Sequence, residues 1–154
     1  MTPTAYLEDL TVGDVRYSQP ASLSEAEIVE FATQWDPQYF HMDPAAARDH
    51  TFGQVAASGI HILALWRRLD HEISGDIRWV CGISWEHLRW AQPLHAEVAV
   101  RACFEIKSKR YSSKPGRGVV NCGYSLIKDD GQPIFYCDAV SLVEARGAAN
   151  PVAG

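Results

Sequence analysis

The spacing of apolar residues changes once along this chain, close to Gly75. Before that point apolar residues recur three and four positions apart, which is typical of helices with one buried face. After it they alternate with polar residues, which is typical of half-buried strands. The expected helices cover residues 24–35, 44–47 and 58–74, and the expected long strands cover residues 77–90, 97–106, 119–127 and 134–143. A short strand is also expected after the turn at Gly13-Asp14.

The expected helix at 58–74 is the element around which the rest should fold. Its first half, Ile60 to Trp66, is apolar on nearly every side, and a helix of that kind is buried. Ser58 suits its N-cap and Gly75 its end. The following strands are joined by segments too short for crossover helices, and Asp129-Asp130-Gly131 marks a hairpin turn. We therefore expect an α+β hot-dog fold, in which an antiparallel meander wraps a central helix.

Composition indicates one soluble domain. The 154 residues are 47% hydrophobic and 21% charged, so we expect a single domain over residues 1–146 and a disordered tail over residues 147–154. The net charge of −5 does not favour nucleic acid or an anionic membrane surface as a partner. No apolar run reaches the roughly 20 residues that cross a bilayer, and the N-terminus lacks signal-peptide features, so the expected location is the cytoplasm.

The cysteines do not indicate a metal site. They lie far apart, one in each expected long strand, with no CxxC pair and no close histidine. In a reducing compartment they are expected to be small buried side chains. The four are Cys81, Cys103, Cys122 and Cys137.

A carboxylate and an imidazole, Asp36 and His41, follow the first expected helix. Ser24 and Glu27 form a capping box that starts this helix, and Pro37 should end it at or near Asp36. Residues five apart do not share a helix face, so a loop has to bring Asp36 and His41 together. Such a pair could perform acid–base chemistry. Alternatively, Asp36 caps a turn and His41 is a hydrogen-bonded loop histidine.

These features together resemble the MaoC-like (R)-specific enoyl-CoA hydratases and dehydratases. The signature of that family is an Asp, four residues, a His, one more residue and usually an Asp, here Asp36, His41 and Asp43. A small residue and a glycine, here Ser58-Gly59, then open the central helix. Many hydratases have a Gly-Asp-x-Asn-Pro-apolar-His segment, from which this chain departs between Trp35 and His41. That departure concerns the acyl group more than the reaction.

The resemblance implies addition or removal of water across the 2,3 double bond of an acyl thioester, carried by coenzyme A or an acyl-carrier protein, without a cofactor. His41 is the natural base, because the unperturbed pKa of histidine is about 6.5, and Asp36 is then the acid. The sequence leaves open which of the two holds which proton. The Gly59 amide would donate to the developing enolate oxygen, unless Gly59 serves only close packing of the helix.

Several residues are expected to contact the substrate. Ser58 is favoured as an N-cap over a catalytic role, and His61 could be a satisfied core histidine. A metal held by His41, Asp43 and His61 is not expected. The expected contacts with substrate are Trp35, Gln38, Tyr39, Phe40, Ser58, His61, Lys114 and Arg117.

Lys114 and Arg117 belong to a basic cluster in an otherwise acidic chain, with Lys107, Lys109 and Arg110. They could bind the phosphates of coenzyme A, or they could form a solvated hairpin.

Two other functions remain open at this point. A hot-dog thioesterase would need a carboxylate placed to attack the thioester or activate water at its carbonyl, and a non-catalytic module would only bind acyl-CoA. Since a sheet backed by one helix leaves an edge strand unpaired, we also expect a homodimer or a higher homo-oligomer.

Overall fold

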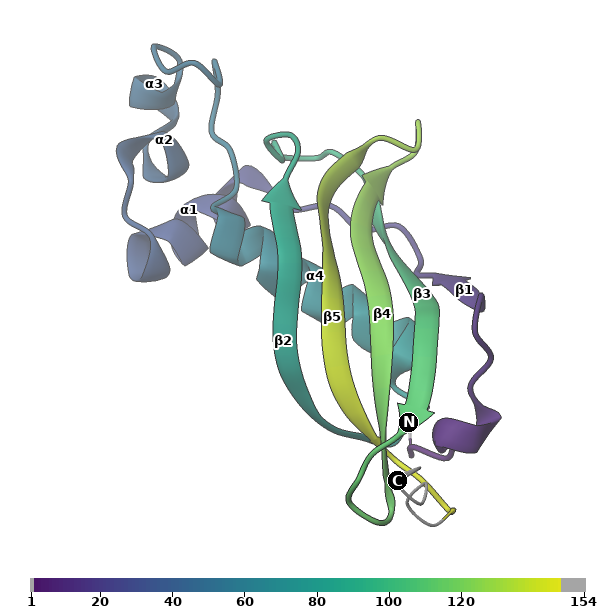
Figure 1. The fold of residues 1–154 in the computed structure, drawn as a ribbon. Coiled ribbons are helices and arrows are strands. Elements are labelled where there is room, and N and C mark those ends of the chain that lie inside the picture. The colour runs from purple at the N-terminus through teal and green to yellow at the C-terminus, as the bar shows by residue number, and fades with distance from the viewer. Residues whose placement is uncertain (1, 148–154) are drawn as a thin grey trace.

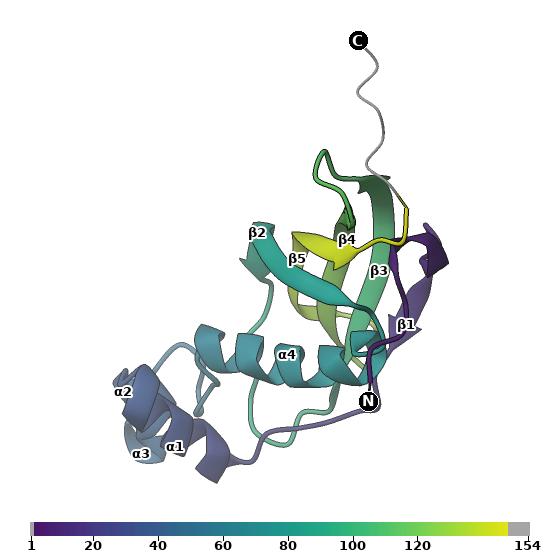
Figure 2. The ribbon, with the colours of Figure 1, turned by 90° about the horizontal axis from the view of Figure 1, so that it is seen from below.

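A long helix, α4 (Gly59–Ser74), lies along the concave face of an antiparallel sheet (Figures 1 and 2). The computed structural model describes residues 2–147, and these confirm the expected α+β hot-dog fold. The strands of the sheet are β1 (Val15–Tyr17), β2 (Trp79–Trp90), β3 (Val100–Tyr111), β4 (Arg117–Lys128) and β5 (Pro133–Glu144). The remaining helices are η1 (Leu7–Asp9), α1 (Glu25–Trp35), α2 (Tyr39–Met42) and α3 (Pro44–Ala47). Helices α1 to α3 gather near the N-terminal end of α4, at one end of the sheet (Figure 1).

The strands lie in the order β1-β3-β4-β5-β2, and every neighbouring pair is antiparallel. Strands β3 to β5 form the expected meander, and the expected turn joins β4 to β5 with Gly131 at a positive φ of 80°. The expectation that the first long strand continues this meander was wrong, because β2 pairs with β5. Residues 91–99 carry the chain back to the far side, which they can do because three strand spacings amount to only about 14 Å. As a result β2 is an edge strand.

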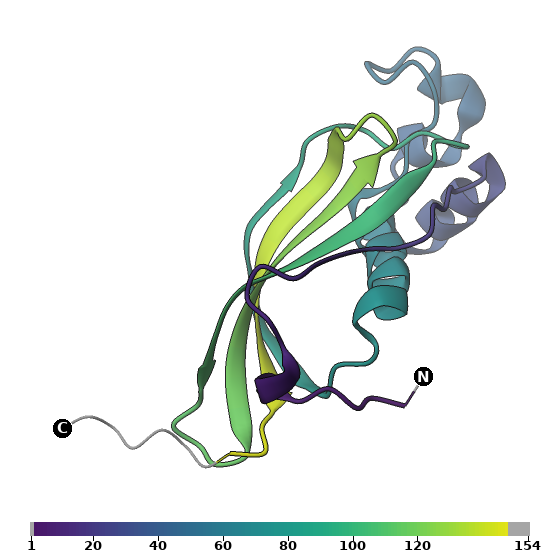
Figure 3. The same cartoon turned by 90° about the vertical axis from the view of Figure 1, so that its right-hand side faces the viewer.

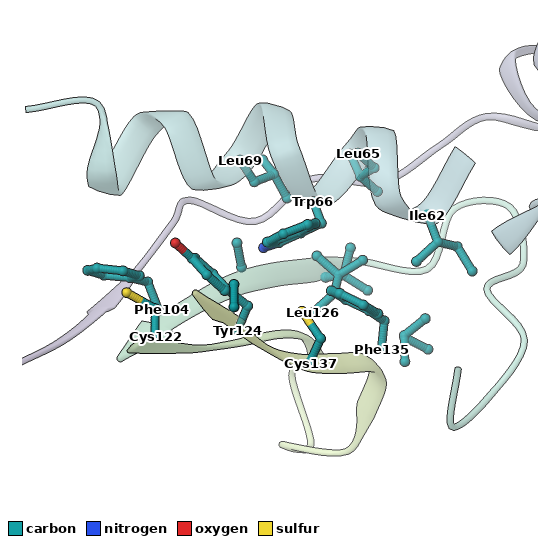
Figure 4. Close-up of a cluster of buried hydrophobic side chains, with 14 of the residues drawn as sticks. Ile62, Leu65, Trp66, Leu69, Phe104, Cys122, Tyr124, Leu126, Phe135 and Cys137 are labelled. Carbon is teal, nitrogen blue, oxygen red and sulfur yellow. The ribbon is translucent and has the colours of Figure 1, made fainter. Parts of the chain in front are cut away.

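The core lies between α4 and the concave face of the sheet. Ile62, Leu65, Trp66 and Leu69 recur at helical spacing and are almost fully buried. The ring of Trp66 lies 5.0 Å from that of Tyr124. In Figure 4 the α4 side chains point at a layer of sheet residues that are themselves buried, namely Phe104, Cys122, Tyr124, Leu126, Phe135 and Cys137. The face of α4 toward the sheet is therefore buried as expected. The expectation that its first half is buried on nearly every side was wrong, because Ile60 is 55% exposed and Ala64 is exposed as well.

The ends of the helices follow from local side chains. The Ser24/Glu27 capping box starts α1, which ends with Asp36 as its C-cap, as expected. Asp43 caps α3 by accepting from the amides of Ala45 and Ala46. Ser58 is the N-cap of α4, and its side chain accepts from the Ile60 amide at 3.3 Å. These caps fix where the chain enters and leaves each helix beside the site.

Three further expectations, on His41, on the cysteines and on the C-terminal tail, have different outcomes. His41 lies on the one-turn helix α2 and not on a loop, because the chain turns back into helical geometry after Pro37-Gln38. Cys122 and Cys137 are buried as expected, whereas Cys81, on the edge strand, is exposed. The expected disordered tail lies, beyond Gly147, outside the described residues. Across residues 2–147 no helix has the length and apolar character needed to span a membrane.

Candidate active site

The side chains of Asp36 and His41 meet beside the first turn of α4. Asp36 ends α1 with non-helical backbone angles, φ −153° and ψ 73°, and its side chain is 27% exposed. His41, on α2, is 7% exposed. Nε2 of His41 lies 3.8 Å from Oδ2 of Asp36. The structure therefore brings together the two residues on which the sequence argument depended.

The orientation of the His41 ring follows from its second nitrogen. Nδ1 lies 2.5 Å from the backbone oxygen of Ala56. A carbonyl oxygen can only accept, so Nδ1 carries the hydrogen and donates it. In the neutral ring Nε2 is then left with a lone pair, and it is Nε2 that faces Asp36. The tautomer suits Nε2 for taking a proton.

Both side chains open into a cavity of about 480 Å³ between α2, the start of α4 and the end of β2. Apolar side chains make up most of its wall, among them Phe40, Phe52, Ile60, Ile62, Trp90 and Pro93. Asp36 and His41 are its titratable lining residues, and Gln92 adds an amide. An apolar group with one polar, reactive end would fit such a cavity.

The first residue of α4, Gly59, also lines the cavity. The first amides of a helix have no acceptor within the helix, and the helix dipole places partial positive charge there. Trp90 lies against this residue and donates from Nε1 to its backbone oxygen at 3.2 Å. A substrate oxygen that gains negative charge would be stabilised at this end of α4.

Only some of the residues expected to contact substrate lie at the cavity. Phe40 lines the cavity, and Ser58 is buried behind it with its hydroxyl 2.5 Å from Oδ2 of Asp36. The side chains of Trp35, Gln38 and Tyr39 are exposed, with Trp35 at 63%. These three surround the loop of Asp36 and are not among the cavity-lining residues.

His61 lies on the side of α4 that faces α1. It lines a separate cavity of about 360 Å³, and its ring stacks on that of Phe31 at 4.2 Å. Burial lowers the pKa of His61, so the fold favours its neutral form. The structure thus places His61 away from the Asp36 cavity.

Lys114 and Arg117 lie at the opposite end of the sheet from Asp36 within the same chain. Lys114 lies in the turn between β3 and β4, and Arg117 is the first residue of β4. Val143 of β5 pairs with Gly118 on one side and with Trp79, the first residue of β2, on the other, so this turn lies at the Trp79 end of the sheet. The cavity, in contrast, adjoins Trp90, the last residue of β2. The turn between β3 and β4 and the helices α1 to α3 lie at opposite ends of the sheet (Figures 1 and 3).

Two lysines of the same basic cluster already have structural partners. Lys109 donates to backbone oxygens of η1, including that of Leu7 at 3.0 Å. Lys107 pairs with Asp138 at 2.5 Å. Both lysines are therefore paired within the chain.

Sequence reasoning did not assign Trp90, Phe52 or Ile62 to the site. An aromatic residue at the end of a strand, such as Trp90, is usually interpreted as sheet packing. The bond from Ser58 to Asp36 was also missed, since a capping serine already has a local partner. Within residues 2–147 no group of three His, Cys, Asp or Glu side chains is arranged to hold a metal ion.

Comparison with known proteins places this geometry in context. The sequence model of the MaoC like domain matches residues 9–128. A MaoC-like dehydratase from Rhodospirillum rubrum is 31% identical, with a TM-score of 0.83 over 94% of this chain and 99% of that one. An (R)-hydratase from A. caviae, involved in PHA biosynthesis, shares the fold at 20% identity, with a TM-score of 0.73 over 90% of this chain and 99% of that one. The uncharacterized protein YdeM of Bacillus subtilis is 28% identical over 68% of this chain and 74% of its own length.

Proposed function

Because the chain belongs to the MaoC-like dehydratase family, we propose that it adds water to, or removes it from, the 2,3 double bond of an acyl thioester. One observation carries the proposal. Asp36 and His41 face each other at 3.8 Å in an apolar cavity that also contains the start of α4. An acid, a base and a site for a developing oxyanion are the three elements that this reaction needs.

In the hydration direction His41 acts first. Its Nε2 lone pair takes a proton from water as the water oxygen bonds to C3 of the substrate. Asp36 gives a proton to C2, and the electron pair of the double bond forms the new C2–H bond through an enolate. A proton passed from His41 to Asp36 through bound water restores both groups.

The enolate oxygen would lie at the N-terminus of α4, where the Gly59 amide is the proposed donor. The Gly59 amide fills this role without a side chain. The space through which the thioester reaches that amide is set by Gly59 and by the indole of Trp90, which lies against it. The thioester bond stays intact throughout, and the reaction needs no cofactor. Coenzyme A or an acyl-carrier protein enters only as the carrier of the substrate.

The test is one assay read in two ways. Purified protein is mixed with a panel of straight, branched and carboxylated 2-enoyl-CoA thioesters, and enoyl absorbance and free thiol are followed together. Loss of absorbance without thiol is the expected result. Release of thiol would identify a thioesterase instead, and binding without turnover across the panel would identify an acyl-CoA-binding module.

We also propose that the protein is a homodimer or a higher homo-oligomer that pairs through β2. Support comes from the position of β2 at the sheet edge and from its exposed large apolar side chains, Val80, Ile83, Trp85 and Trp90. An unpaired edge of this length is a ready template for another strand. Antiparallel pairing of two copies would place the Trp79 end of one strand beside the Trp90 end of the other.

A further inference from the structure

A hydrogen bond from Ser58 to Asp36 joins the proposed acid to the start of α4. The Ser58 hydroxyl lies 2.5 Å from Oδ2 of Asp36, across 22 residues of sequence. Ser58 is 1% exposed, so water does not compete for this contact. Asp36 ends α1 in extended geometry and is 27% exposed, and its own helix does not hold its carboxylate in place.

The direction of this bond follows from the other contact of the same hydroxyl. Ser58 Oγ accepts a hydrogen bond from the amide of Ile60 at 3.3 Å. A hydroxyl has one hydrogen, and a carboxylate oxygen can only accept. The hydrogen of Ser58 is therefore directed at Oδ2, the same oxygen that faces Nε2 of His41 at 3.8 Å.

We infer that Ser58 is a positioning residue for the proposed hydration reaction, and the inference rests on that proposed function. Ser58 holds Oδ2 as an acceptor, which leaves Oδ1 as the oxygen that carries the proton delivered to C2. As that proton leaves, negative charge develops on Asp36, and a hydrogen bond aimed at a developing charge stabilises the transition state. Ser58 itself is 1% exposed and is not one of the residues that line the cavity.

The simpler role for Ser58 is that of an N-cap alone. The chain contains a matched case in Ser24, the N-cap of α1. The Ser24 hydroxyl accepts from the Glu27 amide and donates to the Glu27 carboxylate. Both contacts of Ser24 are local, whereas the hydroxyl hydrogen of Ser58 is directed across the fold to Asp36. Ser24 thus provides a control in which a capping hydroxyl is removed without changing the site.

The variants Ser58→Gly, Ser58→Thr and Ser24→Gly separate the two roles. Glycine is nearly as good an N-cap as serine, so Ser58→Gly removes the hydroxyl with little loss of helix stability. With crotonyl-CoA we expect kcat of Ser58→Gly to fall about 10-fold to 100-fold, since hydrogen bonds to charged groups have about this effect, and KM to change little. Ser58→Thr should recover most of kcat, and Ser24→Gly should keep all of it.

The separate effects on kcat and KM give a readout that a cap alone would not change. A lost cap disturbs the start of α4 and with it the wall of the cavity, so it would change KM as well, whereas loss of the bond to Asp36 should lower kcat alone. Unchanged kcat in folded Ser58→Gly would overturn the inference, as would a kcat loss of equal size in Ser24→Gly.

A crystal structure of Ser58→Gly separates this inference from the proposed reaction, because it needs no turnover. The Asp36 carboxyl group should leave the position in which Oδ2 lies 3.8 Å from Nε2 of His41. If no enoyl thioester turns over but the carboxyl group moves, the proposed function fails and the link between Ser58 and Asp36 stands. If turnover occurs and the carboxyl group stays in place, the inference about Ser58 fails alone.

Discussion

The indole of Trp90 occupies the space that a side chain on Gly59 would need. A Cβ placed on Gly59 would lie 2.9 Å from Cε2 of Trp90, a distance that Cβ atoms in proteins essentially never show, and 3.0 Å from its Nε1. The same Nε1 donates to the Gly59 oxygen at 3.2 Å. The end of the edge strand and the start of α4 are therefore in direct contact, and glycine at this position allows it.

Gly59→Ala is expected to lower activity without lowering stability. The added methyl group has to displace the indole, which is 48% exposed and can move, so the wall of the cavity shifts. Alanine is a better helix former than glycine, so the melting temperature should stay level or rise. We expect kcat/KM for crotonyl-CoA to fall about 10-fold or more, since a displacement of about 1 Å near the reacting atoms has effects of this order.

A second substitution tests whether the clash is the cause. In the double variant Gly59→Ala with Trp90→Leu, the smaller side chain leaves room for the methyl group. The loss caused by Gly59→Ala should be smaller in that background than in the parent chain. Equal losses in both backgrounds would show that the Gly59 backbone itself, and not Trp90, is what the methyl group disturbs.

Asp36→Asn and His41→Ala should each lower kcat by at least about 100-fold, because acid–base groups contribute roughly 100-fold to 10,000-fold. Both variants should fold, as shown by circular dichroism and thermal unfolding. His61→Ala is the matched control for His41→Ala, since His61 lies in a different cavity. If either Asp36→Asn or His41→Ala kept most of the activity, the pair would have no part in the mechanism.

Local signals in the sequence predicted the elements well. The Ser24/Glu27 box, Pro37 and Ser58 each act on backbone groups within a few residues, so their effects can be read without knowledge of the fold. The apolar spacing also identified α4 as the buried helix, because the face that includes Ile62 and Trp66 has to pack on something. Asp36 and His41 were found for a related reason, since one proline constrains the short segment between them.

Long-range relationships could not be read in the same way. β2 lies at the sheet edge and most of its residues are exposed, so its sequence carries little information about its neighbours. Because the first turn of α4 is mostly apolar, its pattern does not indicate that Ile60 and His61 face different cavities. The position of Lys114, at the far end of the sheet from Asp36, depends on strand order, which no local pattern encodes.

Glu8 should make stability depend on pH in the acidic range. Burial opposes its ionisation, but bonds from the amides of Gly147 and Arg146 and from the Tyr111 hydroxyl outweigh this and lower the pKa of Glu8 from 4.5 to about 2. A carboxyl with a lowered pKa in the folded state stabilises the fold above about pH 4.5. That contribution is lost as the pH falls toward 2.

Thermal unfolding across this range checks the effect. Glu8→Gln should be less stable than the parent protein at neutral pH, and the difference should shrink as the pH falls from about 4.5 toward 2. Glu72→Gln, which removes an exposed carboxylate from α4, serves as the control. A difference that stays constant over the whole range would show that ionisation of Glu8 does not contribute.

Sedimentation should give at least a dimer at micromolar concentration, and Ile83→Lys should shift it to the monomer. Ile83 lies in the middle of β2 and is 57% exposed, so a lysine there costs the single chain little but places like charges against each other in a paired edge. Val12, 53% exposed and outside β2, provides the control Val12→Lys. A parent protein that sediments as a monomer would contradict the proposed assembly.

The turn that carries Lys114 and Arg117, here called the basic hairpin, connects the proposed assembly with the proposed binding of substrate. Lys114 and Arg117 are distant from Asp36 in their own chain, but antiparallel pairing through β2 would bring the hairpin of a partner copy to the Trp90 end, where the cavity opens. If that hairpin binds coenzyme A phosphates, Lys114→Ala with Arg117→Ala should raise KM for crotonyl-CoA. A truncated pantetheine thioester, which lacks the nucleotide phosphates, should be almost unaffected. Salt should weaken the effect, since exposed charges are screened over about 10 Å at about 0.1 M.

Mixed dimers decide which copy contributes the hairpin. In a dimer of one Asp36→Asn chain and one chain carrying Lys114→Ala and Arg117→Ala, the remaining active site belongs to the chain without a basic hairpin. If the hairpin acts across the dimer, that site still has the unaltered hairpin of the Asp36→Asn chain, so its KM should match that of the parent protein. A KM as high as that of the doubly substituted homodimer would mean that each hairpin acts in its own chain, and equal impairment toward the truncated substrate would mean that it supports the fold.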